Sequence, residues 1–266
     1  MKKLILSLFA IASLAFAANA VTNMIVKFNG EKTNIFNVDQ VKQVYYREYI
    51  DGVTINGWVG NYSYVDLGLP SGTKWATYNV GATKPTEYGN YFAWGETKPK
   101  EDYNDSTYKW SKDTGEKNNS GRTIYEYTKY CTDSKYGTVD NKKVLDAEDD
   151  AATANWGSAW RMPTFEEMKE LEESCEWDKD YLGYLGCDMY VFRGRSKVNG
   201  ATIFLPYAGD RYNTDLSYAG LSGHYWSSSL SERSSYSAYC LYFYGYEISR
   251  DYDYRYNGHS VRSVLR

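Results

Sequence analysis

The alternation of hydrophobic and polar residues predicts many short strands and a single well-defined helix. Near the N-terminus, Met24, Val26 and Phe28 alternate with polar residues, which is the period of a strand. Asn29-Gly30 follows as a strong signal for a hairpin turn. Residues 34–46 have a mixed spacing, so that a short helix and a strand both stay open there. Further strands, separated by glycines, are predicted at 189–193, 202–205, 236–243 and 260–265.

The helix is predicted from a capping box. Thr164 is a good N-cap residue, and Glu167 stands three positions later, where its side chain can reach back to the N-cap backbone. Met168 and Leu171 then lie on one apolar face. We expect this helix to end near Ser174.

The first twenty residues have the pattern of a signal peptide. Lys2 and Lys3 form a basic start, residues 4–16 are apolar, and Ala18-Asn19-Ala20 is a small-residue cleavage site. A membrane anchor is the alternative, but the apolar run is short for a bilayer. We therefore expect a signal peptide at 1–20 and an exported protein that is periplasmic, surface-bound or secreted, with no transmembrane segment after signal removal.

Glycine-containing dipeptides at 48–63 indicate turns and a linker with a domain boundary near residue 60. The rest of the chain is therefore divided into a small strand module with its linker at 21–60 and a larger domain at 61–266. An aromatic content of 17% with 22 Gly and 5 Pro favours short strands and turns. Together with the capped helix this predicts an α+β fold. The polar stretch 98–143 is expected to be a long surface excursion.

Charge and cysteine content exclude some functions. The net charge of −4 becomes more negative when the two N-terminal lysines are removed, which argues against nucleic acid as a partner. Four cysteines (131, 175, 187 and 240) allow three disulfide pairings, of which we favour 175 with 187 because they flank a short loop-like segment. No Cys-x-x-Cys or His/Cys cluster is present, so no metal site and no cofactor are predicted.

The C-terminal tail, residues 225–257, has nine tyrosines and eight serines among its 33 residues. Tyrosine provides rigid amphipathic contact surface and serine adaptable hydrogen bonds, a mixture typical of binding surfaces. In 250–256 (RDYDYRY) the three tyrosines alternate with charged residues, so neither face suits a buried strand and a loop or exposed ribbon is expected. The predicted aromatic contacts are Tyr236, Tyr239, Tyr242, Tyr244, Tyr246, Tyr252, Tyr254 and Tyr256. The predicted polar contacts are Arg233, Arg250, Asp251, Asp253 and Arg255.

Several strings across residues 64–266 resemble the Fibrobacter succinogenes major paralogous domain family. They are YVDLGLPSGTKWATYNVGA (64–82), YFAWGET (91–97), DDAATANWGSAWRMPTFEEMKEL (149–171), IFLPYAG (203–209), GHYWSSS (223–229) and GHSVRSV (258–264). That family is similar to the C-type-lectin-like fold of formylglycine-generating enzymes and of variable proteins diversified by retroelements. The resemblance implies a compact domain whose first and last strands pair, with ligand-binding surface near the C-terminal end.

The resemblance also permits a test for catalysis. Formylglycine-generating relatives need two neighbouring thiols, and Cys240 has no second cysteine beside it, so no enzyme activity is predicted. His224 and His259 each follow a glycine outside any hydrolase motif and are interpreted as structural. The acidic run 148–150 is interpreted as a helix N-terminus in preference to a calcium site.

These observations predict an exported, non-catalytic protein that binds a protein or carbohydrate ligand through its tail. A further hypothesis is diversification by a retroelement, because Tyr, Ser, Asp, Arg and Cys codons all arise from an asparagine codon by changes in its first two bases. Ordinary drift explains the same composition. The alternative functions are a structural or assembly component of the bacterial cell surface, and a formylglycine-generating-like enzyme with altered chemistry.

Overall fold

The computed structural model describes residues 23–27, 33–37, 52–185 and 188–266. The chain divides into two compact units, Met1–Glu48 and Tyr49–Arg266. The predicted linker extended to residue 60, but strand β3 (Gly57–Val59) pairs with β4 (Tyr62–Asp66) inside the second unit. The second unit therefore begins earlier in the chain than the turn-rich sequence suggested.

In the first unit, β1 (Asn23–Lys27) and β2 (Thr33–Asn37) form an antiparallel pair in which Ile25 lies opposite Ile35. The strand predicted from the alternation of Met24 and Val26 is thus confirmed, and of the two alternatives left open after residue 34, residues 33–37 form a strand. The Asn29-Gly30 turn between them and the signal peptide predicted at 1–20 lie outside the described residues.

The predicted α+β class is wrong, because the fold is mainly β. Strands make up 41% and helices 11% of the described residues, which contain two α-helices, α1 (Ala151–Trp156) and α2 (Phe165–Ser174). Strands such as β7 (Ser111–Lys117) and β17 (Glu247–Tyr254) consist largely of polar residues without hydrophobic alternation. The sequence pattern therefore underestimates the strand content.

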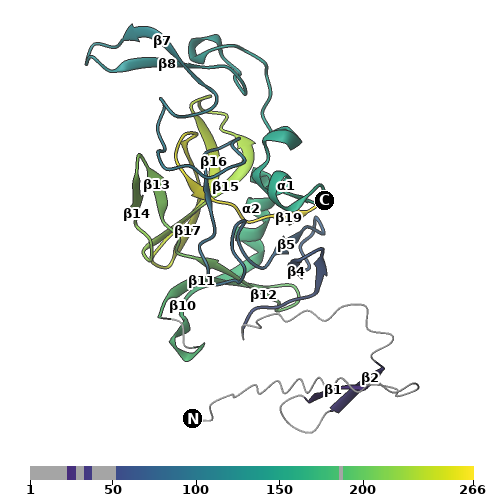
Figure 1. The fold of residues 1–266 in the computed structure, drawn as a ribbon. Coiled ribbons are helices and arrows are strands. Elements are labelled where there is room, and N and C mark those ends of the chain that lie inside the picture. The colour runs from purple at the N-terminus through teal and green to yellow at the C-terminus, as the bar shows by residue number, and fades with distance from the viewer. Residues whose placement is uncertain (1–22, 28–32, 38–51, 186–187) are drawn as a thin grey trace, which may run out of the picture. The chain divides into compact units, whose positions relative to one another are not determined.

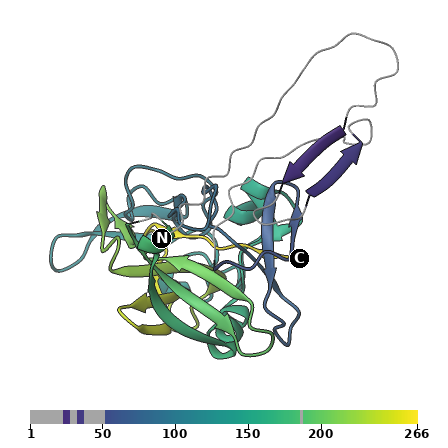
Figure 2. The same ribbon diagram turned by 90° about the horizontal axis from the view of Figure 1, so that it is seen from below.

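Two five-stranded sheets account for most of the second unit, with strand orders β17-β16-β15-β18-β6 and β3-β4-β5-β19-β9. The final strand β19 lies beside β5, near the beginning of this unit (Figures 1 and 2). The remaining strands of the two sheets are β5 (Lys74–Ala76), β6 (Tyr91–Phe92), β9 (Trp160–Arg161), β15 (Ser222–Leu230), β16 (Ser237–Tyr244), β18 (His259–Ser260) and β19 (Val264–Leu265).

Three smaller sheets complete the described part of this unit. The three-stranded sheet consists of β10 (Cys175–Tyr181), β11 (Tyr190–Ser196) and β12 (Thr202–Pro206). One hairpin consists of β13 (Asp210–Tyr212) and β14 (Asp215–Ser217), and the other of β7 and β8 (Thr123–Tyr127). The strands predicted at 189–193, 202–205 and 236–243 are confirmed by β11, β12 and β16. Single turns of 3-10 helix occur at Ser134–Tyr136, Ala147–Asp149 and Leu182–Leu185.

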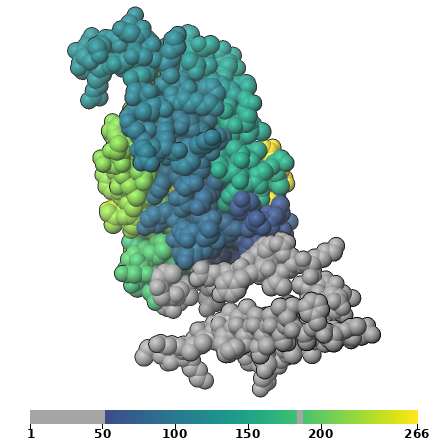
Figure 3. All heavy atoms as spheres, in the orientation of Figure 1, coloured from purple at the N-terminus to yellow at the C-terminus, as the bar shows by residue number. Residues whose placement is uncertain are grey.

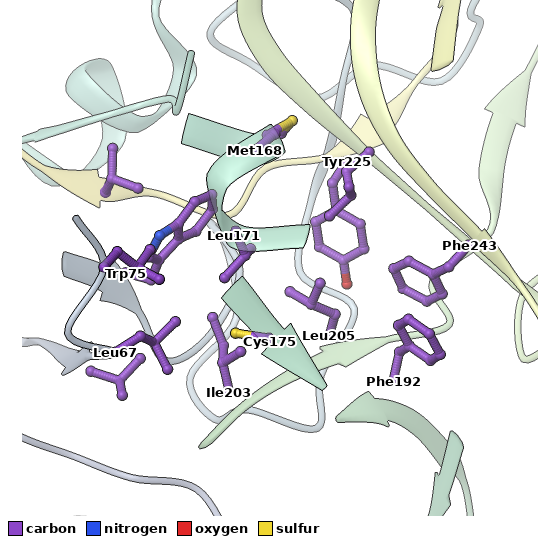
Figure 4. Close-up of a cluster of buried hydrophobic side chains, with 14 of the residues drawn as sticks. Leu67, Trp75, Met168, Leu171, Cys175, Phe192, Ile203, Leu205, Tyr225 and Phe243 are labelled. Carbon is purple, nitrogen blue, oxygen red and sulfur yellow. The ribbon is translucent and has the colours of Figure 1, made fainter. Parts of the chain in front are cut away.

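Helix α2 begins at the predicted capping box. The Thr164 side chain accepts a hydrogen bond from the Glu167 amide at 3.2 Å, and the Glu167 carboxylate accepts one from the Thr164 amide at 2.8 Å. The buried side chains of Met168 and Leu171 pack into a core cluster with residues of both five-stranded sheets and of β10–β12 (Figure 4). Burial of each such side chain contributes about 1.5–3 kcal/mol, so this helix anchors the sheets to one another.

The excursion at 98–143 is a surface hairpin with a buried base. Strands β7 and β8 project beyond the body of the unit (Figures 1 and 3), and β7 is largely exposed. At its base, Tyr103, Tyr108 and Tyr127 are buried in one cluster. These tyrosines fix the ends of the excursion, while its tip has no core contacts.

Cys131, Cys175 and Cys240 are buried free thiols. Cys187 lies outside the described residues, so the favoured pairing of Cys175 with Cys187 finds no support. Within the described residues, no helix is long and apolar enough to cross a membrane.

Candidate functional site

One face of the sheet β17-β16-β15-β18-β6 carries the candidate site. Neighbouring strands place His224 opposite Tyr242, and Cys240 opposite Asp251. Asp253 lies two residues further along β17 and thus on the same side, because side chains alternate along a strand. The five side chains therefore face the same space.

The parallel pairing of β15 with β18 brings the two histidines of the chain together. Tyr225 pairs with Ser260, so the residues that precede them, His224 and His259, are neighbours with ring centroids 5.0 Å apart. His259 is fully buried and stacks on Trp226 at 3.9 Å. His224 is only partly buried and reaches the open side of the sheet.

The β13–β14 hairpin forms a second wall. Gly209 forms a backbone bridge with Gly223, and its amide donates a hydrogen bond to the Ser222 carbonyl at 2.7 Å. Gly209 has a φ of +65°, and a Cβ here would collide with the backbone around Ser217. Gly223 likewise has no room for a side chain, because a Cβ there would collide with the Phe243 ring. The bridge between Gly209 and Gly223 joins the hairpin to β15, and Asp210 Oδ1 lies 3.9 Å from His224 Nε2.

Between these walls lies a pocket of about 610 Å³. Three aspartates and four tyrosines line it, and no lysine or arginine of the described residues does. The lining residues are Asp210, Tyr218, Ser222, His224, Cys240, Tyr242, Tyr244, Asp251, Tyr252 and Asp253. The pocket thus combines aromatic faces, which suit a sugar ring or an apolar side chain, with negative charge.

Asp253 is held by hydrogen bonds on both oxygens. Its Oδ2 accepts from His259 Nε2 at 2.9 Å and from Asn257 Nδ2 at 3.0 Å, and its Oδ1 accepts from the Tyr254 amide at 2.7 Å. Burial by itself would raise the pKa of Asp253, but the hydrogen bond and charge of His259, with the other two donors, lower it to about 2. Asp253 is therefore ionised at neutral pH.

Burial also shifts the pKa values of two other groups in the pocket, His224 and Cys240. Burial, assisted by the nearby His259, lowers the pKa of His224 to about 3, so its imidazole is neutral at neutral pH. Burial, with the charges of Asp253, Asp251 and Asp210, raises the pKa of Cys240 well above its usual value. Cys240 is consequently a thiol, which is a weak nucleophile.

Five of the residues predicted to contact a ligand line this pocket: Tyr242, Tyr244, Asp251, Tyr252 and Asp253. Arg233 lies over the ring of Tyr252, at 5.1 Å from the centroid. Tyr254 is exposed and stacks on the half-buried Tyr256 at 5.2 Å. Tyr246, in the turn between β16 and β17, is 74% exposed. The predicted ribbon is the edge strand β17, and it carries part of the site.

Three other predicted contacts serve the fold. Tyr236 packs against Tyr127 at 5.2 Å, and Tyr239 stacks on Phe165 of α2 at 4.1 Å. Arg250 Nε forms an ion pair with Glu172 of α2 at 2.7 Å. The side chains of Tyr239 and Arg250 lie on the α2 side of the sheet, opposite to the pocket, because their positions alternate with those of Cys240 and Asp251.

The expectation that every charged residue of 250–256 faces outward is wrong for Arg255. Strand β17 ends at Tyr254, after which the Arg255 side chain enters the core and is fully buried. Its guanidinium donates hydrogen bonds to the Tyr108 hydroxyl and to the carbonyls of Lys129, Tyr130 and Ser235, at 2.9–3.2 Å. Arg255 therefore ties the base of the excursion to the sheet and cannot contact an external ligand.

The sequence interpretation missed six residues at or beside the pocket: Asp210, Tyr218, Ser222, His224, Cys240 and His259. The histidines were interpreted as turn residues. The sequence did contain a signal that could have pointed to these histidines as a pair: the chain has two histidines, and each follows a glycine directly before a strand core. Their common partners, however, come from segments distant in the sequence.

A second carboxylate cluster, Asp146, Glu148 and Asp149, is already neutralised. Lys129 Nζ lies 2.6 Å from Asp149, 2.7 Å from Asp146 and 3.4 Å from Glu148. Next to it, Asp150 caps α1 by accepting a hydrogen bond from the Thr153 amide at 2.9 Å. The capping interpretation of this acidic run is confirmed for Asp150.

No protein-family model, curated protein or solved structure matched this chain in our comparisons.

Proposed function

We propose that this chain is an exported, non-catalytic binding protein that recognises a protein or carbohydrate ligand at the pocket on the β15–β17 face. The observation that carries the proposal is the distribution of exposed aromatic and aliphatic side chains. Eight of the fourteen large hydrophobic residues that are exposed in the described part of the chain fall between residues 212 and 254. They are Tyr212, Leu216, Tyr218, Leu221, Tyr244, Tyr246, Tyr252 and Tyr254.

This surface has the chemistry of a recognition site. Tyr218 and Tyr244 belong both to the exposed set and to the pocket lining, so they connect the concave pocket with its surroundings. The ring of Tyr252, opposite Tyr239 in the register, lies on the other face of the sheet. Tyrosine provides contact area at a small cost in side-chain entropy, and its hydroxyl can hydrogen-bond to a polar ligand. Contiguous exposed aromatic residues are unusual unless they meet a partner.

The absence of catalysis is supported by the state of the possible nucleophiles in the pocket. In the part of the chain that the structure describes, the Ser222 hydroxyl has no hydrogen-bond partner, although a serine nucleophile needs a base within hydrogen-bonding distance. Cys240 is held as a thiol by its raised pKa. The described thiols Cys175 and Cys240 belong to separate core clusters, so these two do not form a copper-binding pair.

The resemblance to the major paralogous domain family and the signal-peptide pattern support export and surface recognition. Retroelement diversification is part of the proposal, since tail residues that such mutagenesis produces, among them Asp251, Tyr252 and Asp253, line the pocket. Sequencing of the neighbouring DNA tests this point. A reverse transcriptase gene and an adenine-rich near-copy of the tail are expected there, and the lack of both would refute diversification.

The ligand-binding proposal is tested on an array of glycans and bacterial surface proteins. Wild type is compared with a Tyr218→Ala/Tyr244→Ala double variant, which removes two exposed rings at the pocket. The matched control is Tyr181→Ala/Tyr190→Ala, which removes a pair of similarly exposed tyrosines from β10 and β11. We expect a specific wild-type signal that the pocket variant loses and the control keeps. Equal signals from both double variants would refute the assignment of the binding site.

A further inference from the structure

We infer that His224, Asp253 and His259 bind a divalent transition-metal ion of the zinc class, with Asp210 in position to complete the coordination. The nitrogen and oxygen ligand atoms of the first three all lie within 4.8 Å of one another. These residues come from three different strands or turns, and they include both histidines of a 266-residue chain. This inference goes beyond the proposed function and does not depend on it.

The spacing is close to that of a metal site. Zinc lies about 2.0–2.1 Å from histidine nitrogen and about 2.0–2.2 Å from carboxylate oxygen, so two tetrahedral ligands are about 3.4 Å apart. Asp253 Oδ2 and His259 Nε2 are now 2.9 Å apart, and Asp210 Oδ1 and His224 Nε2 are 3.9 Å apart. The ligand atoms of His224, Asp253 and His259 lie within 4.8 Å of one another, so shortening these separations by at most about 1.4 Å brings them to ligand distances. The ion then replaces the Asp253–His259 hydrogen bond.

The surrounding charges favour a cation. No lysine or arginine of the described residues lines the pocket, so the carboxylates of Asp210 and Asp253 have no fixed basic partner there. The cluster Asp146, Glu148 and Asp149 has a similar spacing, but Lys129 occupies it. This contrast distinguishes the two clusters, because an ammonium group already supplies the positive charge in the second one.

Two buried polar groups support the site. Asn257, itself only 7% exposed, donates a hydrogen bond to Asp253 Oδ2 and so orients the carboxylate, as partners of metal ligands do. Ser222 lines the pocket with 2% exposure, and its hydroxyl has no hydrogen-bond partner among the described residues. A hydroxyl in that position can bind a water or ligand oxygen that completes the coordination on the pocket side.

The donor set selects the class of metal. Two imidazoles with one or two carboxylates suit zinc and its neighbours in the first transition row. Calcium and magnesium prefer sites made of oxygen ligands alone. The site is therefore expected to bind Zn²⁺ or Co²⁺ and to ignore Ca²⁺ at the same concentration.

Metal titration of the protein without a histidine tag tests the inference. After treatment with a chelator, Zn²⁺ is titrated against a fluorescent competitor, and one ion per chain is expected. His224→Ala should weaken zinc affinity by about 100-fold or more, since loss of an outer partner alone costs about 10–100-fold. Glu148→Gln, which alters the cluster occupied by lysine, is the matched control and should leave the affinity unchanged.

A second measurement uses wild type alone, in case the variant does not fold. Because the chain has two histidines, the imidazole region of a ¹⁵N NMR spectrum contains signals from two rings, and both should shift when Zn²⁺ is added. Failure to bind one zinc ion, zinc binding that leaves either ring unchanged, equal affinity of the His224→Ala variant, or a preference for Ca²⁺ would each overturn the inference. None of these outcomes bears on the tyrosine variants, so the two proposals fail separately.

Discussion

Replacement of Arg255 by methionine should destabilise the second unit without a direct effect on the pocket. Methionine keeps an unbranched apolar side chain of similar length but removes all donors. The carbonyls of Lys129, Tyr130 and Ser235 then stay buried without the hydrogen bonds that the guanidinium donates. The contacts of the guanidinium with the surrounding rings are lost as well; for example, Arg255 Cζ lies 4.4 Å from the centroid of the Tyr127 ring.

The magnitude follows from these contacts. A buried acceptor that loses its donor costs about 1–3 kcal/mol, and four acceptors are affected when the Tyr108 hydroxyl is included. Part of this loss is offset, because the variant no longer has to bury a charged group that lacks a carboxylate partner. We therefore expect the free energy of unfolding to fall by about 3–5 kcal/mol, a large share of the 5–15 kcal/mol typical of a folded domain.

Urea unfolding followed by tryptophan fluorescence measures this loss. The control is Arg250→Met, which removes a partly exposed ion pair with Glu172 and should cost about 1 kcal/mol or less. If the two variants lost equal stability, the structural role of Arg255 would be refuted. Undiminished stability of Arg255→Met together with lost ligand binding would instead restore the original expectation of a contact residue.

Three further changes have defined outcomes. Gly209→Ala should cost about 3 kcal/mol in urea unfolding, since it adds a collision with the Ser217 backbone to the strain of a positive φ. Gly220→Ala meets no atom of the described residues and should cost about 1 kcal/mol. Equal losses would contradict the close packing of Gly209 against the backbone of residues 217–219. Burial opposes a low pKa for Asp149, but the hydrogen bonds that this carboxylate accepts from Lys109, Lys129 and Tyr130 outweigh burial and lower the pKa. The contribution of Asp149 to the free energy of unfolding is therefore present above about pH 4 and is lost as the pH falls further. Asp149→Asn should therefore lower stability at pH 7 and flatten the dependence below about pH 4 in unfolding curves; an unchanged acid limb would contradict this. Replacement of residues 112–126 by a short Gly-Ser linker should leave the unfolding free energy within about 1 kcal/mol, because the removed tip has no core contacts, and a larger loss would show that the hairpin supports the fold.

The sequence by itself determined the local features of this protein. The capping box of Thr164 and Glu167 is formed by residues three positions apart, so it could be recognised without any knowledge of the tertiary structure. The same holds for short strands with apolar runs, such as β12 and β16. Of the eight tyrosines predicted as contacts, four are exposed: Tyr244, Tyr246, Tyr252 and Tyr254. The polar strands were not predicted, because they are held by backbone pairing with neighbouring strands and have no hydrophobic pattern in the sequence. The α+β prediction is wrong for the same reason.

Only the tertiary structure decided where the chemistry lies. Asp210, His224 and His259 meet because β15 pairs in parallel with β18 and because a backbone bridge between Gly209 and Gly223 joins the β13–β14 hairpin to β15. Arg255 continues an alternating exposed pattern in the sequence, yet its side chain enters the core where β17 ends. The physical reason is the same in both cases: strand register and backbone approach depend on residues far apart in the chain, while caps and alternation depend on near neighbours.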